Sequence, residues 1–228
     1  MQLNPSQLSA VLHLSSSVLP IGGYSYSQAL EGAVELGLVH DEASTLNWIH
    51  EQAQWLISRC DAPIWWLLFD AWMTEDLTTV QLWNHYYYAL RETAELRLES
   101  SQMGWSLHQL ATSLDWYPAK VALNLEPLCF LSVHALCCAH LQLPATAGLT
   151  GFLYSWLENQ VMAAIKSVPL GQMAGQRILQ HLQGHFPELI HEAQARSQDT
   201  PPRIQSFAPR YALVSARHEH QFNRLFRS

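Results

Sequence analysis

The amino-acid sequence predicts an all-α protein, and three observations predict it. Apolar side chains recur at three-, four- and seven-residue steps through most of the chain. Prolines and glycines fall between these segments, where helices begin and end. No run of alternating polar and apolar residues is followed by a hairpin turn. We therefore expect a single-domain helical bundle of about ten helices over residues 1–196, followed by a flexible C-terminal tail.

Caps and breaks set the expected helix boundaries. Asn4-Pro5 suits a helix start, because asparagine caps the first turn and proline fits its first position. The expected helices cover residues 7–15, 25–37, 44–60, 61–74, 78–90, 91–114, 127–143, 145–168, 170–183 and 187–196. Residues expected to set backbone geometry at the breaks are Pro20, Gly22, Gly23, Pro169 and Gly171.

The composition changes after residue 196. Residues 197–210 are polar and rich in proline, so they bury too little apolar surface to order themselves, and we expect a flexible linker there. Residues 211–228 follow as a basic tail in which Phe222, Leu225 and Phe226 lie among arginines. This mixture favours a docking segment, while a frayed terminus is the plainer alternative.

Charge and hydropathy exclude several classes of protein. The net charge is −7 and the 12 lysines and arginines are scattered, which argues against nucleic acid as a partner. The apolar windows at residues 63–73 and 128–139 are too short to cross a membrane, and the N-terminus does not resemble a signal peptide. Four cysteines form no disulfide framework. We expect a cytoplasmic protein whose low charge and nine tryptophans suit an interface.

The motifs of several enzyme classes are missing from the sequence. It has no GxxxxGK[ST] phosphate loop, no HExxH zinc motif and no GxSxG nucleophile elbow. One alternative remains in the segment that holds His134, Cys137, Cys138 and His140. Imidazole and thiolate suit nickel or zinc, so an all-helical metal-dependent enzyme could use His134, Cys137 and His140. The segment is strongly apolar, however, and free cysteines are often buried, which favours a core helix.

Three segments together resemble one family. Residues 12–31 read LHLSSSVLPIGGYSYSQALE, residues 154–176 read YSWLENQVMAAIKSVPLGQMAGQ, and residues 215–228 read SARHEHQFNRLFRS. Each is similar to a signature of the UreF family of urease accessory proteins, and they occur in the family's order. Residues 91–104 give a fourth, weaker match. The sequence departs from the pattern at Ala29, where the family often has glycine, and at Phe222-Asn223, where Tyr-Ser is common.

The resemblance implies that the protein acts by binding other proteins. A UreF-like protein would be an all-α homodimer that binds the accessory protein UreD (UreH) and, with it, recruits the GTPase UreG to apo-urease. It would couple the nucleotide state of UreG to nickel insertion without being an enzyme and without a tightly bound cofactor. A third hypothesis, activation of a GTPase by an arginine finger, needs an arginine on a rigid element, and most arginines here lie in the tail or on amphipathic helices.

The resemblance also assigns candidate residues. Lys166 precedes the Val-Pro-Leu-Gly-Gln run and is expected on the UreG side, together with Glu31 and Glu158, although a solvated charged stripe is the plainer interpretation of such residues. The tail is expected on the UreD side. Its candidate residues are Arg217, His218, Glu219, Phe222, Arg224, Leu225, Phe226 and Arg227.

Overall fold

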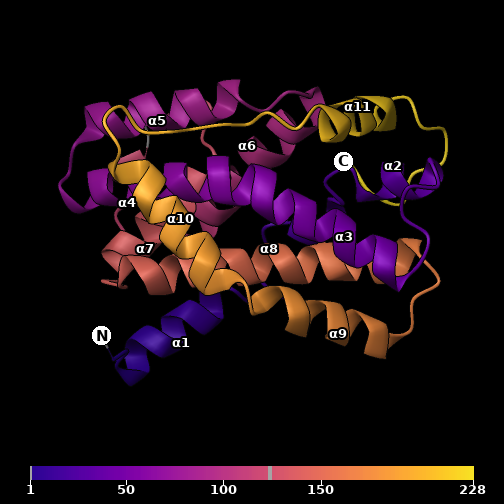
Figure 1. The fold of residues 1–228 in the computed structure, drawn as a ribbon. Helices are drawn as coiled ribbons and strands as arrows, with labels where there is room; N and C mark the ends of the chain where they lie inside the picture. The colour runs from indigo at the N-terminus through magenta and orange to yellow at the C-terminus, as the bar shows by residue number, and fades with distance from the viewer. Residues whose placement is uncertain (1, 123–124) are drawn as a thin grey trace.

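The computed structural model describes residues 2–122 and 125–228, and within these residues it holds helices and no β-strand (Figure 1). This confirms the all-α prediction. The α-helices are α1 (Pro5–Leu14), α2 (Leu30–Glu35), α3 (Glu42–Gln52), α4 (Ala62–Met73), α5 (Leu77–Ala89), α6 (Ala94–Ser113), α7 (Phe130–His140), α8 (Ala145–Ser167), α9 (Gln172–Gln183), α10 (Phe186–Gln198) and α11 (Pro209–His218). No helix in the described ranges is long and apolar enough to cross a membrane.

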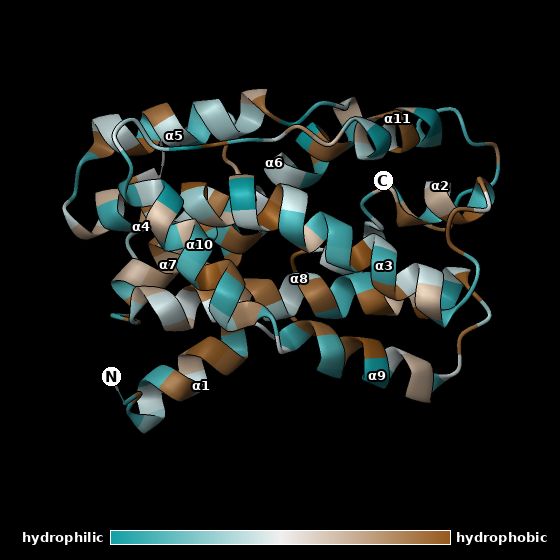
Figure 2. Ribbon diagram, in the orientation of Figure 1, coloured by the Kyte–Doolittle hydropathy of each residue, from teal (hydrophilic) through white to brown (hydrophobic). Residues whose placement is uncertain are grey.

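Helices α4, α7 and α8 form the centre of the bundle. Every residue of α7 from Leu131 to Ala139 is buried, as are nine of the twelve residues of α4. Helix α4 packs against α5, α7 and α10, α6 covers α7, and α8 contacts α1, α2 and α9. Figure 2 shows the outer helices, such as α9, with both hydrophilic and hydrophobic stretches, as expected for helices with one buried side.

Helices α3 and α4 are joined by a π-helix, Ala53–Asp61, so the chain is helical without interruption from Glu42 to Met73. The sequence predicts that one helix ends at residue 60 and that residues 61–63 start the next, and Pro63 does lie in the first turn of α4, but the π-helix runs into α4 without the expected interruption. Proline has no N–H to donate to the carbonyl of Arg59. That carbonyl accepts a hydrogen bond from the backbone N–H of Gln205 at 2.9 Å, and residues of the expected linker thereby pair with the bundle.

The segment between α1 and α2 makes sharp turns through positive φ angles. Gly22 has φ +78°, a conformation that glycine adopts without strain. Gln28 and Ala29 follow with φ +50° and +66°. Ala29 is the position at which the related family often has glycine, and its left-handed conformation explains that preference. The turn aims the Gln28 side chain toward α6 and α8.

The C-terminal tail lies against the bundle. Helix α10 ends at Gln198, and the segment drawn in yellow crosses the molecule to α11, which begins at Pro209, inside the expected linker (Figure 1). Residues 219–228 then turn back onto the start of α2, where Arg227 N–H donates to Ser25 O at 2.8 Å and Ser27 N–H to Ser228 O at 2.7 Å. The structure thus differs from the expectation of a tail that stands apart from the helical body. The flexibility of residues 197–210 stays a prediction.

Candidate functional site

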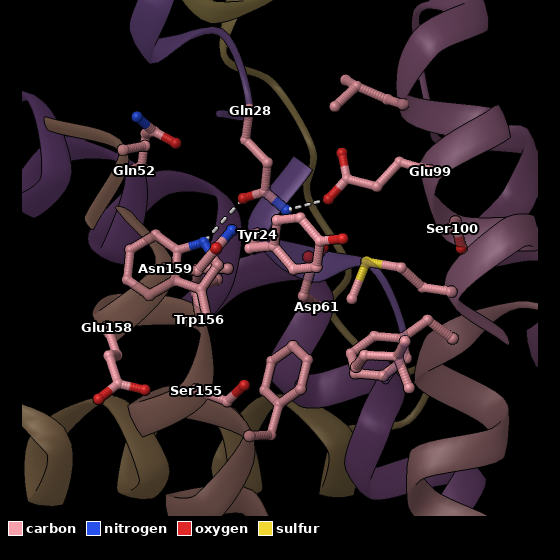
Figure 3. A pocket seen from close by; sticks show the side chains of 18 of the residues that line it. Tyr24, Gln28, Gln52, Asp61, Glu99, Ser100, Ser155, Trp156, Glu158 and Asn159 are labelled. Carbon is pink, nitrogen blue, oxygen red and sulfur yellow. Dashed lines mark hydrogen bonds between the residues drawn. The ribbon is translucent and has the colours of Figure 1, made fainter. Parts of the chain in front are cut away.

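The candidate site is a cavity of about 320 Å³ beside α8. Its walls come from the turn segment of residues 16–28, the α3–π-helix junction, α6 and α8, and Tyr211 of α11 closes one side. Figure 3 shows Gln28 between Glu99 of α6 and Trp156 of α8. Elements from both ends of the chain therefore build this one site.

Gln28 ties these walls together. Its side-chain Nε2 donates to Glu99 Oε1 at 2.7 Å, and its Oε1 accepts from Trp156 Nε1 at 2.9 Å (Figure 3). The same Oε1 also accepts from Gln160 Nε2 at 3.3 Å. The positive φ of Gln28 makes this reach possible. The amide thereby joins α6 to α8 across the cavity, and it fixes the turn that precedes α2.

The cavity wall carries polar atoms without partners. Gln52 Nε2, Arg91 Nε and Ser100 Oγ are buried, line the cavity and have no hydrogen-bond partner in the described part of the chain. Buried polar atoms are normally satisfied by protein or by ordered water. A cavity of this size has room for water beside all three atoms. We therefore interpret the cavity as a hydrated space with mixed apolar and polar walls rather than a packing defect.

Two carboxyl groups at the cavity have raised pKa values. Burial raises the pKa of Glu99 to about 7, although hydrogen bonds from Gln28 and Ser228 act in the opposite direction. Burial also raises the pKa of Glu158, which is half-buried on α8. Asp61, in contrast, forms an ion pair with Arg91 at 2.8 Å. Burial thus disfavours the charged forms of Glu99 and Glu158, whereas the charge of Asp61 is paired with that of Arg91.

Lys166 and Glu158 both line the cavity from α8, with Lys166 exposed to solvent. The Lys166 Nζ atom lies 5.6 Å from the centre of the Phe226 ring in the tail. The structure thus brings together the two α8 residues that the sequence singled out. Both lie where another molecule can reach them.

Glu31, the third residue that the sequence analysis expected on the UreG side, is buried and binds the C-terminal tail. Its Oε1 accepts from Leu225 N–H at 2.7 Å, and its Oε2 accepts from Phe226 N–H at 3.0 Å. His218 Nε2 lies 3.1 Å from the same carboxylate, while His218 Nδ1 lies 2.8 Å from Glu95. Glu31 therefore contacts this chain's own tail, and a partner can reach it only if the tail moves.

The tail candidates divide between an inner and an outer side. His218 and Phe226 are buried, and Arg224 forms an ion pair with Glu95 at 2.7 Å. Phe222 is 98% exposed and Leu225 72%. Arg217 and Arg227 are also exposed, while Glu219 is half-buried and accepts from Ala94 N–H at 3.0 Å. The outer side thus offers apolar and basic groups, and the inner side fixes the conformation of the tail.

The glycines and prolines at the breaks have unequal roles. Pro20 lies in the turn segment before Gly22, and Gly23 is close enough to Met103 that an added Cβ would lie 3.3 Å from its Cε. Pro169 directly follows the C-cap of α8. Gly171 caps α9 at φ −74° with open space around it, so its conformation does not require glycine.

The structure does not bring His134, Cys137 and His140 together as a metal site. His134 is buried, accepts a hydrogen bond from Trp65 Nε1 at 3.0 Å, and has its pKa lowered to about 4 by burial. Burial raises the pKa of the Cys137 thiol far above neutral. His140 is exposed at the end of α7. In the described residues no group of histidine, cysteine and acidic side chains is arranged to hold a metal ion, and the enzyme alternative loses its proposed site.

The fold and the site define an all-α protein with a cavity beside α8 and a C-terminal tail held against the helical body. A model of the UreF family matches residues 39–183. The urease accessory protein UreF of Bordetella parapertussis is 56% identical over 220 residues, which cover 95% of this chain and 100% of the relative. That of Polynucleobacter asymbioticus is 41% identical over 230 residues, 100% of both chains. The chain belongs to the UreF family of urease accessory proteins.

One relative is longer. The bifunctional urease accessory protein UreEF of Bordetella bronchiseptica is 56% identical over 229 residues, which cover 99% of this chain and 53% of the relative. The chain therefore spans about half the length of that protein. It spans the full length of the two shorter relatives named above.

Sequence reasoning missed part of this site. Gln28, Glu99 and Gln52 are cavity residues that the sequence analysis did not single out. Gln28 and Glu99 lie inside two of the matched segments, 12–31 and 91–104, and this was the available signal. Periodicity could not find them, because Gln28 lies in a turn and the polar side chains of Gln52 and Glu99 on helices look like ordinary surface residues in the sequence.

Proposed function

We propose that this chain is a binding scaffold in the maturation of urease, without catalytic chemistry of its own. In this proposal it binds UreD (UreH), and the pair recruits the GTPase UreG to apo-urease, so that the nucleotide state of UreG is coupled to nickel insertion. The observation that carries the proposal is the family membership, because relatives named as urease accessory proteins align with nearly the whole chain.

Two surfaces support the proposal. Lys166 and Glu158 lie at the cavity on α8, and we assign them to the UreG side. The outer side of the tail, with Phe222, Leu225 and the exposed arginines, is assigned to UreD. Exposed aromatic and arginine side chains are the groups that most often anchor protein interfaces. Glu31 acts indirectly in this scheme, because it holds the tail in the shape that a partner meets.

The proposal includes the state of the protein in the cell. We expect a homodimer in the cytoplasm that binds no cofactor tightly and acts on nickel and GTP through its partners. Large apolar side chains on the surface, among them Val18 at 86% and Trp105 at 59% exposure, support self-association or a partner interface. Analytical ultracentrifugation of the purified chain tests the dimer directly.

The composition offers a sharp test of the UreG side. The chain has only two lysines, Lys120 and Lys166, and both are exposed. An amine-reactive crosslinker applied to the complex with UreD and UreG is expected to join Lys166 to UreG, while Lys120 serves as the internal control. A complex that assembles but crosslinks to UreG through Lys120 alone would place UreG on another face. If the chain binds neither UreD nor UreG, the proposed scaffold function is contradicted.

A further inference from the structure

Three histidines from three different elements meet on the surface near the end of α9. His50 lies in the last turn of α3, His181 in the last turn of α9, and His185 immediately precedes α10. The ring centroids of His50 and His185 are 5.1 Å apart, and those of His181 and His185 are 5.4 Å apart. His181 is exposed and the other two are half-buried, so solvent reaches the cluster.

The backbone gives His181 and His185 the spacing of a metal-binding pair. Gly184 and His185 keep right-handed backbone angles, φ −61° and −88°, so the chain continues in a nearly helical path from α9 to His185. Side chains four residues apart on a helix lie on one face, and two histidines at this spacing are an established arrangement for binding a transition metal. His50 approaches the same face from α3.

The separations match those of imidazoles that share an ion. A metal–imidazole bond measures about 2.0–2.1 Å and the ring adds roughly 1.1 Å to its centre, so two rings on one ion have centroids roughly 4.5–5.5 Å apart. Both measured distances fall in this range. The rings now meet edge to face and are not yet closed around a common point, in agreement with the absence of a preformed metal group in the described residues. Coordination of one ion by all three rings therefore requires these side chains to rotate from the positions seen here.

Neighbouring side chains fix the relative positions of the elements that carry the three histidines. Arg177, one turn before His181, bonds Glu42 of α3 through both carboxylate oxygens at 2.8 and 2.6 Å, which ties α9 to the helix that carries His50. Glu188 Oε2 lies 3.7 Å from His185 Nδ1 and can orient that ring.

We propose that His50, His181 and His185 form a surface site for a divalent transition metal of the class that includes Ni²⁺ and Zn²⁺, with water completing the coordination. Neutral imidazole is a preferred ligand of these ions. Because the site is open and needs side-chain rotation, it exchanges its ion readily rather than holding it permanently. The inference stands apart from the proposed binding of UreD and UreG, since it concerns the chain alone.

Calorimetric titration of the metal-free, full-length chain with NiCl₂ at pH 7.5 tests the site. We expect one exchangeable ion per chain, and we expect His181→Gln and His185→Gln each to weaken its binding at least tenfold. His40→Gln and His220→Gln remove exposed histidines outside the cluster and are expected to leave the affinity unchanged. His181 is exposed, so its replacement leaves no buried cavity, and a circular dichroism melt without metal checks that each variant is folded.

Ring-nitrogen NMR spectra locate the ion independently. Paramagnetic Ni²⁺ is expected to broaden the signals of His50, His181 and His185 first, because these rings would lie nearest to the bound ion. Equal affinity in the cluster variants and the two control variants would overturn the proposal. Broadening that begins at other histidines would overturn it as well.

Discussion

The interpretation of Glu31 changes once its neighbours in the structure are known. In the sequence it closes a motif and reads as an exposed partner contact. In the structure its carboxylate is buried, accepts hydrogen bonds from two backbone N–H groups of the tail and faces His218. The residues that it contacts lie almost at the other end of the chain, so no local pattern could have indicated them.

Replacing Glu31 with glutamine is expected to loosen the tail. The amide cannot supply two charged acceptors for Leu225 and Phe226, and hydrogen bonds to charged groups each contribute about 1.5–3 kcal/mol. We expect Glu31→Gln to lower the free energy of unfolding by about 2 kcal/mol and to speed tryptic cleavage after Arg224. Glu35→Gln on the exposed end of the same helix is the matched control. Identical proteolysis of both variants would show that the tail is held by other contacts.

Glu99 gives the stability a pH dependence with a definite sign. Its folded pKa is raised from 4.5 to about 7, so between these values the folded state keeps a proton that the unfolded state has lost. The contribution of Glu99 to the free energy of unfolding therefore falls as pH rises through this window. The total decrease, up to about 3 kcal/mol, is reached above pH 7.

Glu99→Gln is expected to remove that cost. We expect the variant to melt at a higher temperature than the parent protein at pH 8, and the difference to shrink toward pH 5. Comparing variant and parent at each pH cancels the contributions of the other titrating groups. A melting difference that is constant from pH 5 to 8 would mean that Glu99 does not titrate in this range.

Lys166 is expected to matter for binding and little for stability. It is exposed on α8, and its contact with the Phe226 ring is a long one, so Lys166→Ala is expected to stay within about 0.5 kcal/mol of the parent stability. We expect the same variant to lose UreG from a pull-down and to lower nickel-dependent urease activation. Lys120→Ala is the control. Parent-level results in both assays would remove Lys166 from the proposed UreG side.

At the scale of elements, the tail is where sequence and structure differ most. Its composition predicts a detached docking segment, because a proline-rich stretch precedes it. The structure instead makes α11 and the residues after it part of the bundle, with Val214, His218 and Phe226 buried. The helices themselves are local structures, set by caps and periodicity, so the sequence predicts them well. The packing of the tail depends on Glu31, Glu95 and Gly32, which no periodic pattern connects with it.

Removing residues 211–228 is expected to leave a helical but less stable body. The deletion uncovers the surface that Val214 and Phe226 bury, and each buried side chain of this size contributes about 1.5–3 kcal/mol. We expect a fall in melting temperature of roughly 10 °C, since each kcal/mol shifts a domain of this size by about 2–4 °C. Circular dichroism measures both helicity and melting.

Two point variants separate the inner and outer sides of the tail. Phe226→Ala is expected to reproduce much of the loss in melting temperature, whereas Phe222→Ala, at a side chain that is 98% exposed, is expected to leave it unchanged and weaken UreD binding. A deletion that melts like the parent protein would instead mean that the tail leaves the body in solution.

At the scale of the whole molecule, the sequence predicts the fold class and the helices better than the boundaries between helices and the contacts between distant segments. The predicted boundary between residues 60 and 61 is an example: the chain passes from α3 through a π-helix into α4 without leaving the helical path. Proline signals a lost N–H, and sequence alone cannot say that Gln205 supplies another donor to the freed Arg59 carbonyl. The cavity residues are hard to predict for the same reason, since they meet only when distant helices pack.

The burial of Ser228 has a practical consequence for how the chain can be joined to other sequences. Ser228 is 1% exposed, and its backbone oxygen and hydroxyl bond Ser27 and Glu99, whereas the first residues of α1 are exposed at the edge of the molecule (Figure 1). An affinity tag after Ser228 is therefore expected to displace the last residues and lower the melting temperature. The same tag before Met1 is expected to be tolerated. Tags, reporters or links to a solid support should therefore be attached at the amino-terminal end. Equal melting curves for the two tagged forms would contradict this expectation.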